Sequence, residues 1–195
     1  MRHSILMGLS LAAVVAVAGC EKAGDAEVDR AMEAVNAIDG ADISNVMLTA
    51  ADPNEGVAYF KRTLAEKPDR IDLQRGLAIS LIRAKRYEEA VGAWKRVVAN
   101  EESSLDDQVD LADALIRTGE WEQANATLDA VPPTHETFKR YRLEAVVADS
   151  SKEWDKADSF YEIAVGLTTR PAGVLNNWGY SKLTRGDFTD AERLF

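Results

Sequence analysis

The stretch that decides the fold of this chain is Tyr87-Glu88-Glu89-Ala90-Val91-Gly92-Ala93-Trp94. In it an aromatic residue is followed three positions later by a small residue and, four positions after that, by a large apolar one. The same frame recurs, and its small residue falls at Gly56, Ala90, Ala124, Ala157 and Ala191. These positions are 34 or 33 residues apart. A fixed period of this length indicates an array of repeated structural units.

A second small position runs in phase with the first, at Ser44, Ala78, Ala112, Ala145 and Gly179. Two small residues per unit are what a helix hairpin needs, because a large side chain at the crossing would push the two helices apart. We expect the large residue that begins each second helix to fill the space beside the crossing. These residues are Tyr87, Trp121, Trp154 and Phe188. An ordinary amphipathic bundle would explain any one unit, but not five units in register.

The beginning of the chain has the features of an export signal. Residues 1–4 are short and basic, and residues 5–19 are uncharged and mostly apolar. This run is shorter than the about 20 residues of a membrane span and is typical of a signal peptide. Residues 17–20, Val-Ala-Gly-Cys, resemble the bacterial lipobox, whose cysteine is lipidated and becomes the mature N-terminus. The alternatives are a plain signal peptide or a free thiol packed in a helix.

The lipobox resemblance implies a lipoprotein with a lipid anchor, palmitate included, on Cys20. Several acyl chains on one cysteine would hold the protein at the membrane essentially permanently. Glu21 follows the cysteine, which by the enterobacterial sorting rule favours the outer membrane over the inner one. We therefore expect a signal peptide over 1–19, a tether over 20–25, and a periplasm-facing repeat domain over 26–195 in the bacterial cell envelope.

The charge and the composition of the chain argue against two classes of partner. The chain has 23 Lys and Arg against 33 Asp and Glu, a net charge of −10. Nucleic acid and anionic headgroups attract clustered basic residues, so the sequence predicts neither as a partner. Hydrophobic residues make up 46% and charged residues 29%, as in a folded soluble domain. Cys20 is the one cysteine, so the sequence predicts no disulfide within the chain.

The pattern predicts an N-terminal helix over 26–38, which would cap the first hairpin. Asp52 and Pro53 are typical of a helix start, with Glu55 completing a pattern like a capping box. Glu144 stands where the repeat usually has an apolar residue. Phe195 falls in the middle of a predicted second helix, so we expect this chain to be part of a longer protein. The five units are expected over 41–68, 71–102, 105–131, 138–169 and 175–195.

These units resemble the tetratricopeptide repeat (TPR) family, above all in residues 175–180 (Leu-Asn-Asn-Trp-Gly-Tyr) and 186–191 (Gly-Asp-Phe-Thr-Asp-Ala). The resemblance implies an all-α solenoid of helix hairpins that forms a right-handed superhelix and acts as a non-catalytic scaffold. With the lipobox, the chain looks like the TadD-type lipoprotein of tight-adherence (Flp) pilus systems, which implies a secretin or pilus assembly component as partner. Pilotins of the PilF/PilW type, assembly lipoproteins of the BamD type and repeat lipoproteins that dock a peptidoglycan synthase are the alternatives.

In the family frame, the first helix of each hairpin lines a concave groove that often binds an extended peptide or a helix. The predicted groove positions mix branched apolar residues with four arginines. They are Asn45, Leu48, Arg75, Ile79, Ile82, Arg83, Val109, Asp113, Ile116, Arg117, Arg142, Val146, Asn176, Tyr180 and Leu183. Arginine binds carboxylates bidentately, so we hypothesise a peptide ligand with apolar anchors and acidic groups or a free C-terminus. Alternatively, the arginines pair with acidic residues of neighbouring units.

The sequence contains no motif of an enzyme. It has no phosphate-binding loop, no dinucleotide-binding glycine pattern and no H-E-x-x-H. His135 is the one histidine of the mature chain, and we expect it to be a solvated loop residue. Adjacent carboxylates such as Asp106-Asp107 stand at helix ends, and nothing in the pattern indicates that they are buried. We predict no catalytic residue, no metal site, no cofactor and no small-molecule substrate.

Overall fold

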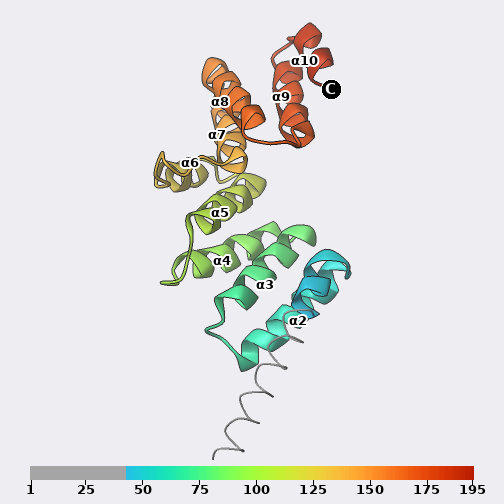
Figure 1. Ribbon diagram of the computed structural model, residues 1–195, viewed down its shortest axis with the longest axis vertical. Coiled ribbons are helices and arrows are strands. Elements are labelled where there is room, and N and C mark those ends of the chain that lie inside the picture. Colours follow the sequence, from blue (N-terminus) through green and yellow to red (C-terminus); the bar gives the residue numbers. More distant parts are fainter. Residues whose placement is uncertain (1–42) are drawn as a thin grey trace, which may run out of the picture. The chain divides into compact units, whose positions relative to one another are not determined.

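The computed structural model describes residues 43–195, and all regular structure within them is α-helical (Figure 1). Residues 43–49 form the first helical segment. The helices that follow are α2 (Pro53–Glu66), α3 (Ile71–Arg83), α4 (Tyr87–Val98), α5 (Leu105–Thr118), α6 (Trp121–Asp129), α7 (Phe138–Ser150), α8 (Trp154–Gly166), α9 (Ala172–Thr184) and α10 (Phe188–Leu194). The predicted signal peptide, Cys20 and the helix expected over 26–38 lie outside these residues.

Successive helices pair into hairpins, and each hairpin packs against the next. The pairs are α3 with α4, α5 with α6, α7 with α8, and α9 with α10, while α2 pairs with α3 and with the segment before it (Figure 1). The expected all-α solenoid of helix hairpins is therefore confirmed. The fifth unit begins at Ala172, three residues before the expected position, because Pro171 can start a helix that it could not continue. No helix among residues 43–195 is long and apolar enough to cross a membrane.

Side-chain caps fix several helix starts. Asp52 caps α2 as expected, accepting a hydrogen bond from the backbone N–H of Asn54, with Pro53 in the first helical position. A full capping box forms at α5 instead. The Ser104 hydroxyl accepts from the Asp107 N–H, and the Asp107 carboxylate accepts from the Ser104 N–H at 2.7 Å.

The small residues of both series lie at the helix crossings. All of them except Ser44 are buried, which confirms the frame. At a third position, Gly76, two helices approach each other even more closely. A Cβ added to Gly76 on α3 would lie 2.3 Å from a ring atom of Phe60 on α2. Only glycine allows these two helices to approach so closely.

The aromatic residues that begin the second helices do not all fill the space beside the crossings. Trp121 is 39% exposed and Phe188 is 67% exposed, so the expectation was wrong for these two. Each lies in the first turn of its helix, at the end of the hairpin. The core is filled by the large residue one turn beyond the small one. These residues are Phe60, Trp94, Leu128 and Tyr161.

The buried residues form two hydrophobic clusters. One extends from α2 to α7 and the other from α7 to α9. They meet on α7, where Val147 belongs to the first and its neighbour Ala148 to the second. This helix therefore contributes to both parts of the core.

Candidate functional site

The predicted groove residues lie on the helical segment 43–49, α3, α5, α7 and α9, which are the first helices of the five hairpins. Most of them are exposed or half-buried, with Tyr180 the most exposed apolar side chain among them, at 63%. Val109 is an exception. Only 1% of it is exposed, and it belongs to the main hydrophobic cluster. Val109 is therefore a core residue, since the face of α5 that it occupies packs inward.

Arg75 is held by the neighbouring unit. Its guanidinium donates two hydrogen bonds to the Asp107 carboxylate, at 2.8 and 2.7 Å, and one to the backbone carbonyl of Glu102. Burial of Asp107 works to raise its pKa, but the hydrogen bonds from Arg75 and Ser104 outweigh burial and hold the pKa below its usual value. The carboxylate is thus ionised and buried. The sequence pattern gave no sign of this burial, and that expectation was wrong.

Two more of the four arginines also have partners within the chain. Arg83 donates to the carbonyls of Met47, at 3.0 Å, and Ala51, at 3.1 Å, and so satisfies the end of the preceding helical segment. Arg117 pairs with Asp113 at 3.2 Å, one turn earlier on α5, and its guanidinium lies 5.6 Å from the ring centre of Tyr87. All three arginines thus have internal partners, but only Arg75 pairs with an acidic residue of a neighbouring unit, as the alternative expected.

Arg142 differs from the other three arginines. Among residues 43–195, no hydrogen bond or ion pair links its guanidinium to another residue. It lies half-buried on α7, one turn before Val146 and two turns before Asp149. Of the four arginines, Arg142 is the one with a cation still available to a ligand.

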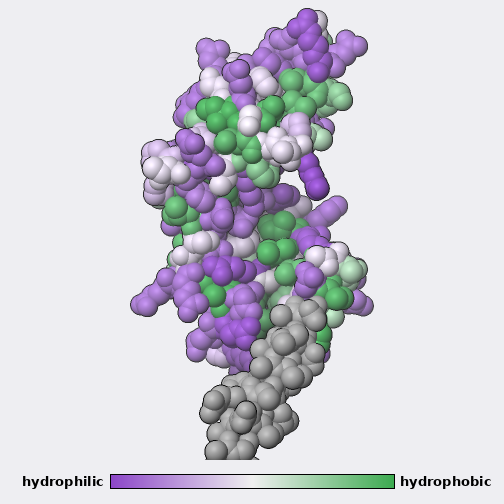
Figure 2. Space-filling view, in the orientation of Figure 1, coloured by the Kyte–Doolittle hydropathy of each residue, from purple (hydrophilic) through white to green (hydrophobic). Residues whose placement is uncertain are grey.

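A cavity of about 460 Å³ lies beside Asp149 and is formed mainly by α7 and α9, with Trp121 at the start of α6 and two residues of α8, Trp154 and Tyr161. We call it the α7–α9 cavity. It contains three predicted groove residues, Val146, Asn176 and Tyr180. Its remaining lining residues are Trp121, Asp149, Ser150, Trp154, Tyr161, Asn177, Ser181 and Thr184. Figure 2 shows hydrophobic side chains gathered over the part of the molecule where Figure 1 places α7 to α9.

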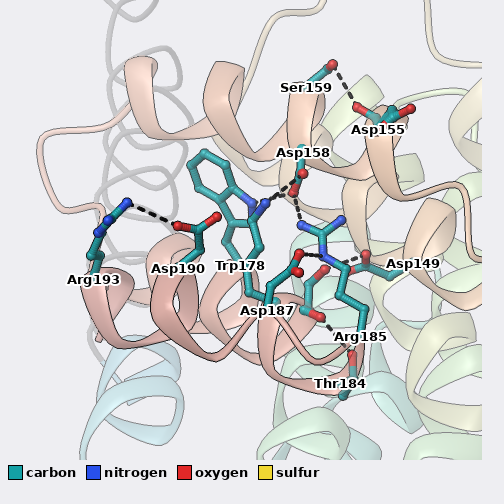
Figure 3. Close-up of polar contacts among 12 residues, drawn as sticks. Asp149, Asp155, Asp158, Ser159, Trp178, Thr184, Arg185, Asp187, Asp190 and Arg193 are labelled. Atoms are coloured by element: carbon teal, nitrogen blue, oxygen red, sulfur yellow. Dashed lines mark hydrogen bonds and ion pairs between the residues drawn. The ribbon is translucent and has the colours of Figure 1, made fainter.

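Two aspartates beside this cavity have very different surroundings (Figure 3). Asp158 accepts from the indole N–H of Trp178 at 2.6 Å, and it pairs with Lys182 at 2.9 Å and Arg185 at 2.6 Å. Asp149 accepts only from two neutral hydroxyls, of Tyr161 at 2.8 Å and Ser181 at 2.7 Å.

Their pKa values differ accordingly. Burial works to raise the pKa of Asp158, but its bonds to Arg185, Lys182 and Trp178 outweigh burial and lower it. For Asp149 burial prevails over the hydrogen bonds from Ser181 and Tyr161 and over the charge of Arg185, with which it forms no ion pair, and its pKa is raised. Two carboxylates of one region are thus set apart by the presence or absence of cationic partners.

The wall of the α7–α9 cavity is rich in aromatic rings. Trp121 and Trp154 come from the starts of α6 and α8, and Tyr180 comes from α9. Arg185 lies over the ring of Trp154, 5.7 Å from its centre, and directs its guanidinium to Asp158. Trp121 also lines a second hollow of about 310 Å³, between α6 and the α7–α8 hairpin.

Other polar residues singled out by the sequence have structural partners. Glu144 pairs with Arg140 on α7 at 2.8 Å, which explains why a carboxylate is tolerated at an apolar position of the repeat. His135 is half-buried rather than solvated, and its Nε2 lies 2.9 Å from an Asp106 carboxylate oxygen. Within the described part of the chain, no group of three His, Cys, Asp or Glu side chains is arranged to hold a metal ion.

Sequence reasoning did not identify the cavity. It placed Trp121 and Trp154 in the hairpin frame and did not consider Asp149 at all. One sign of the cavity was present in the sequence. Asp149 stands in the last turn of a first helix, at the position of the repeat where two earlier units have Ile82 and Ile116. Position alone could not reveal that Ser181, from the next unit, would meet this carboxylate.

No family model and no curated protein matches the sequence. Solved structures do match the fold. MamA (residues 41 to the end) from Desulfovibrio magneticus RS-1 has a TM-score of 0.64 at 18% identity, covering 80% of this chain and 88% of that one. Another MamA structure has a TM-score of 0.60 at 20% identity over 78% of this chain and 90% of its own.

YrrB, whose structure is described as that of a TPR protein with an unusual peptide-binding site, has a TM-score of 0.58 at 12% identity. The match covers 78% of this chain and 79% of YrrB. At sequence identities this low, the structural similarity establishes only the fold. Together with the repeat period and the buried small residues, it gives residues 43–195 the TPR fold.

Proposed function

We propose that this chain is a non-catalytic scaffold that binds a protein partner along the shared face of α7 and α9. The observation that carries the proposal is the α7–α9 cavity, which adjoins the exposed side chains of Asn176 and Tyr180. YrrB, a protein of similar fold, is described as having a peptide-binding site. A concave pocket with aromatic walls and a few polar groups is the usual form of a binding site.

The proposed site covers only part of the groove that the sequence suggested. Arg75, Arg83 and Arg117 stabilise the solenoid itself, so an acidic group of a ligand would meet Arg142. The binding face is accordingly centred on the fourth and fifth units.

For the biological setting, we propose an outer-membrane lipoprotein that is anchored through Cys20 and assists assembly of a Tad/Flp pilus or a secretin-type secretion complex. Support comes from the lipobox at residues 17–20 and from the repeats that follow it. A regulator of outer-membrane protein assembly or of peptidoglycan synthesis is the second candidate, favoured by the same lipobox and repeats.

A photo-crosslinking amino acid at Tyr180, in the full-length protein in its own cells, tests the scaffold role. The matched control places the same amino acid at Glu162, an exposed position of α8. We expect one specific product from Tyr180 and none from Glu162. Recovery of a secretin or pilus protein supports the first setting, and a peptidoglycan enzyme or barrel-assembly protein supports the second. Equal products from both positions would contradict the proposed binding face.

The anchor has a separate test. We expect Cys20→Ala to abolish labelling with radioactive palmitate and to leave the protein soluble or retained as a precursor. Labelling that persists in this variant would refute the lipid attachment without touching the scaffold proposal.

A further inference from the structure

We infer that the α7–α9 cavity receives a basic side chain, lysine or arginine, of the protein partner, with Asp149 as the counter-charge and the aromatic wall around the cation. The inference rests on the proposed scaffold function, because it names the chemistry of the partner at that same face. It differs from the acidic ligand that the groove arginines suggested.

The first argument is that no cation of the described residues pairs with the Asp149 carboxylate. Asp149 lines the cavity, and within residues 43–195 no lysine or arginine forms an ion pair with it. Its two oxygens accept one hydroxyl hydrogen each, so each retains a lone pair for a further donor. A partly buried carboxylate without a cation is unfavourable, and a donor cation from a ligand would relieve that cost.

The second argument is that the basic residues at the end of α9 are committed to other carboxylates. Arg142, free within residues 43–195 and two turns before Asp149 on α7, is not among the residues that line the cavity. Lys182 and Arg185 both pair with Asp158. Arg185 also lies 3.0 Å from the Asp187 carboxylate. Figure 3 shows dashed contacts from the Arg185 guanidinium to Asp158 and Asp187 and none to Asp149. None of the residues that line the cavity is a lysine or an arginine. The cavity wall therefore carries one carboxylate and no positive charge.

The third argument is the aromatic wall. A cation within about 6 Å of an aromatic ring centre is attracted to the ring face, most strongly for tryptophan. Arg185 already contacts Trp154 in this way, so Trp121 and Tyr180 are the rings that remain for a ligand. The rings would also cover the apolar stem of the basic side chain.

The size and the polar groups of the cavity agree with a peptide side chain. Its volume of about 460 Å³ lies in the range of about 300–1,000 Å³ that is typical of ligand pockets. The amides of Asn176 and Asn177 and the hydroxyl of Thr184 can bond to a peptide backbone at the rim. An acidic side chain here would meet Asp149 and be repelled.

The test titrates four capped tripeptides into the full chain. They are acetyl-Gly-X-Gly-amide with X as lysine, arginine, glutamine or glutamate. The readout is the NMR signal of each tryptophan indole N–H. Trp121 and Trp154 report on the cavity, and Trp94, which is buried in the main core, is the internal reference.

We expect the lysine and arginine peptides to shift the Trp121 and Trp154 signals, leaving Trp94 unchanged. Binding of the glutamine and glutamate peptides should be at least about tenfold weaker, the ratio expected for the loss of one charge-assisted contact. Asp149→Asn should weaken the lysine peptide by the same factor. Glu162→Gln, which removes one exposed carboxylate from α8 outside the cavity, should leave it unchanged.

Equal binding of the glutamine peptide, unchanged binding to Asp149→Asn, or no shift with any peptide would overturn the inference. Were Asp149→Asn to misfold, Trp121→Leu offers a second route. Its side chain is partly exposed, and its loss should weaken the basic peptides several-fold. The scaffold proposal is judged separately by the Tyr180 crosslink, so a partner that binds without using a basic residue would refute this inference alone.

Discussion

Replacing Gly76 with alanine would place a methyl group against the ring of Phe60. The new Cβ would lie 2.3 Å from Cε1 and 2.5 Å from Cζ of that ring, whereas carbon atoms in contact are about 3.5–4.0 Å apart. Phe60 is fully buried, and Tyr59 packs edge-on against it with ring centres 5.0 Å apart. The ring therefore has to move by more than about 1 Å within a packed core.

The size of the effect follows from two opposing contributions. Alanine is favoured over glycine in a helix interior by about 1 kcal/mol. Overpacking a core costs about 1–3 kcal/mol, and so short a contact belongs at the upper end. We expect Gly76→Ala to lower the free energy of unfolding by about 1–2 kcal/mol.

Gly92 supplies the matched control. It also lies inside a helix, α4, but a Cβ added there meets no atom within 4 Å. Gly92→Ala should therefore raise the free energy of unfolding by about 0.5–1 kcal/mol. Urea unfolding of both full-length variants, followed by circular dichroism, measures the difference, which should be about 1.5–3 kcal/mol.

Equal stability of the two variants would refute the reasoning about close approach of α2 and α3. A second comparison isolates the cause. In a Phe60→Leu background the ring is gone, so the further cost of Gly76→Ala should largely disappear. A cost that persists would place the strain somewhere other than at this contact.

Ala124→Leu, at a fully buried helix crossing, should destabilise the protein by a few kcal/mol in thermal unfolding. Ala126→Leu, on the exposed side of α6, is the control and should have little effect. An unchanged melting temperature for Ala124→Leu would show that the repeat frame is misplaced. Arg83→Ala removes two hydrogen bonds to the end of segment 43–49, so amide exchange there should become faster by about tenfold or more, with α5 as the unaffected reference. The pKa of Asp107 is lowered in the folded state, so its contribution to stability is present above about pH 4 and is lost as the pH falls through the lowered value. The stability difference between the wild type and Asp107→Asn should accordingly shrink between pH 7 and pH 2 in urea unfolding, and a difference independent of pH would contradict the assignment of the buried ion pair.

The positions that close packing dictates could be predicted from the sequence. Alanine at positions 90 and 124 fits because the space at a helix crossing admits little else, and both residues are buried. The helix start at Asp52 could likewise be predicted, since local chemistry alone determines it.

Features that depend on two distant residues could not be predicted. Asp107 is buried because Arg75, 32 residues earlier, reaches its carboxylate, and sequence spacing does not reveal which arginine finds which acid. The cavity beside Asp149 depends in the same way on Ser181 of the next unit. Val109 occupies the same position of the repeat as Arg75, Arg142 and Asn176, none of which is buried, so the frame alone could not show that this short apolar side chain would be buried.

Because the two hydrophobic clusters meet on α7, a partner that binds there would change the stability of units that it does not contact. In a repeat array, stability is the sum of each unit's own contribution and the coupling to its nearest neighbours. The two clusters meet at Val147 and Ala148, so this coupling runs through one helix. A partner held between α7 and α9 would stabilise the second cluster directly, and the first cluster would gain only through α7, which belongs to both.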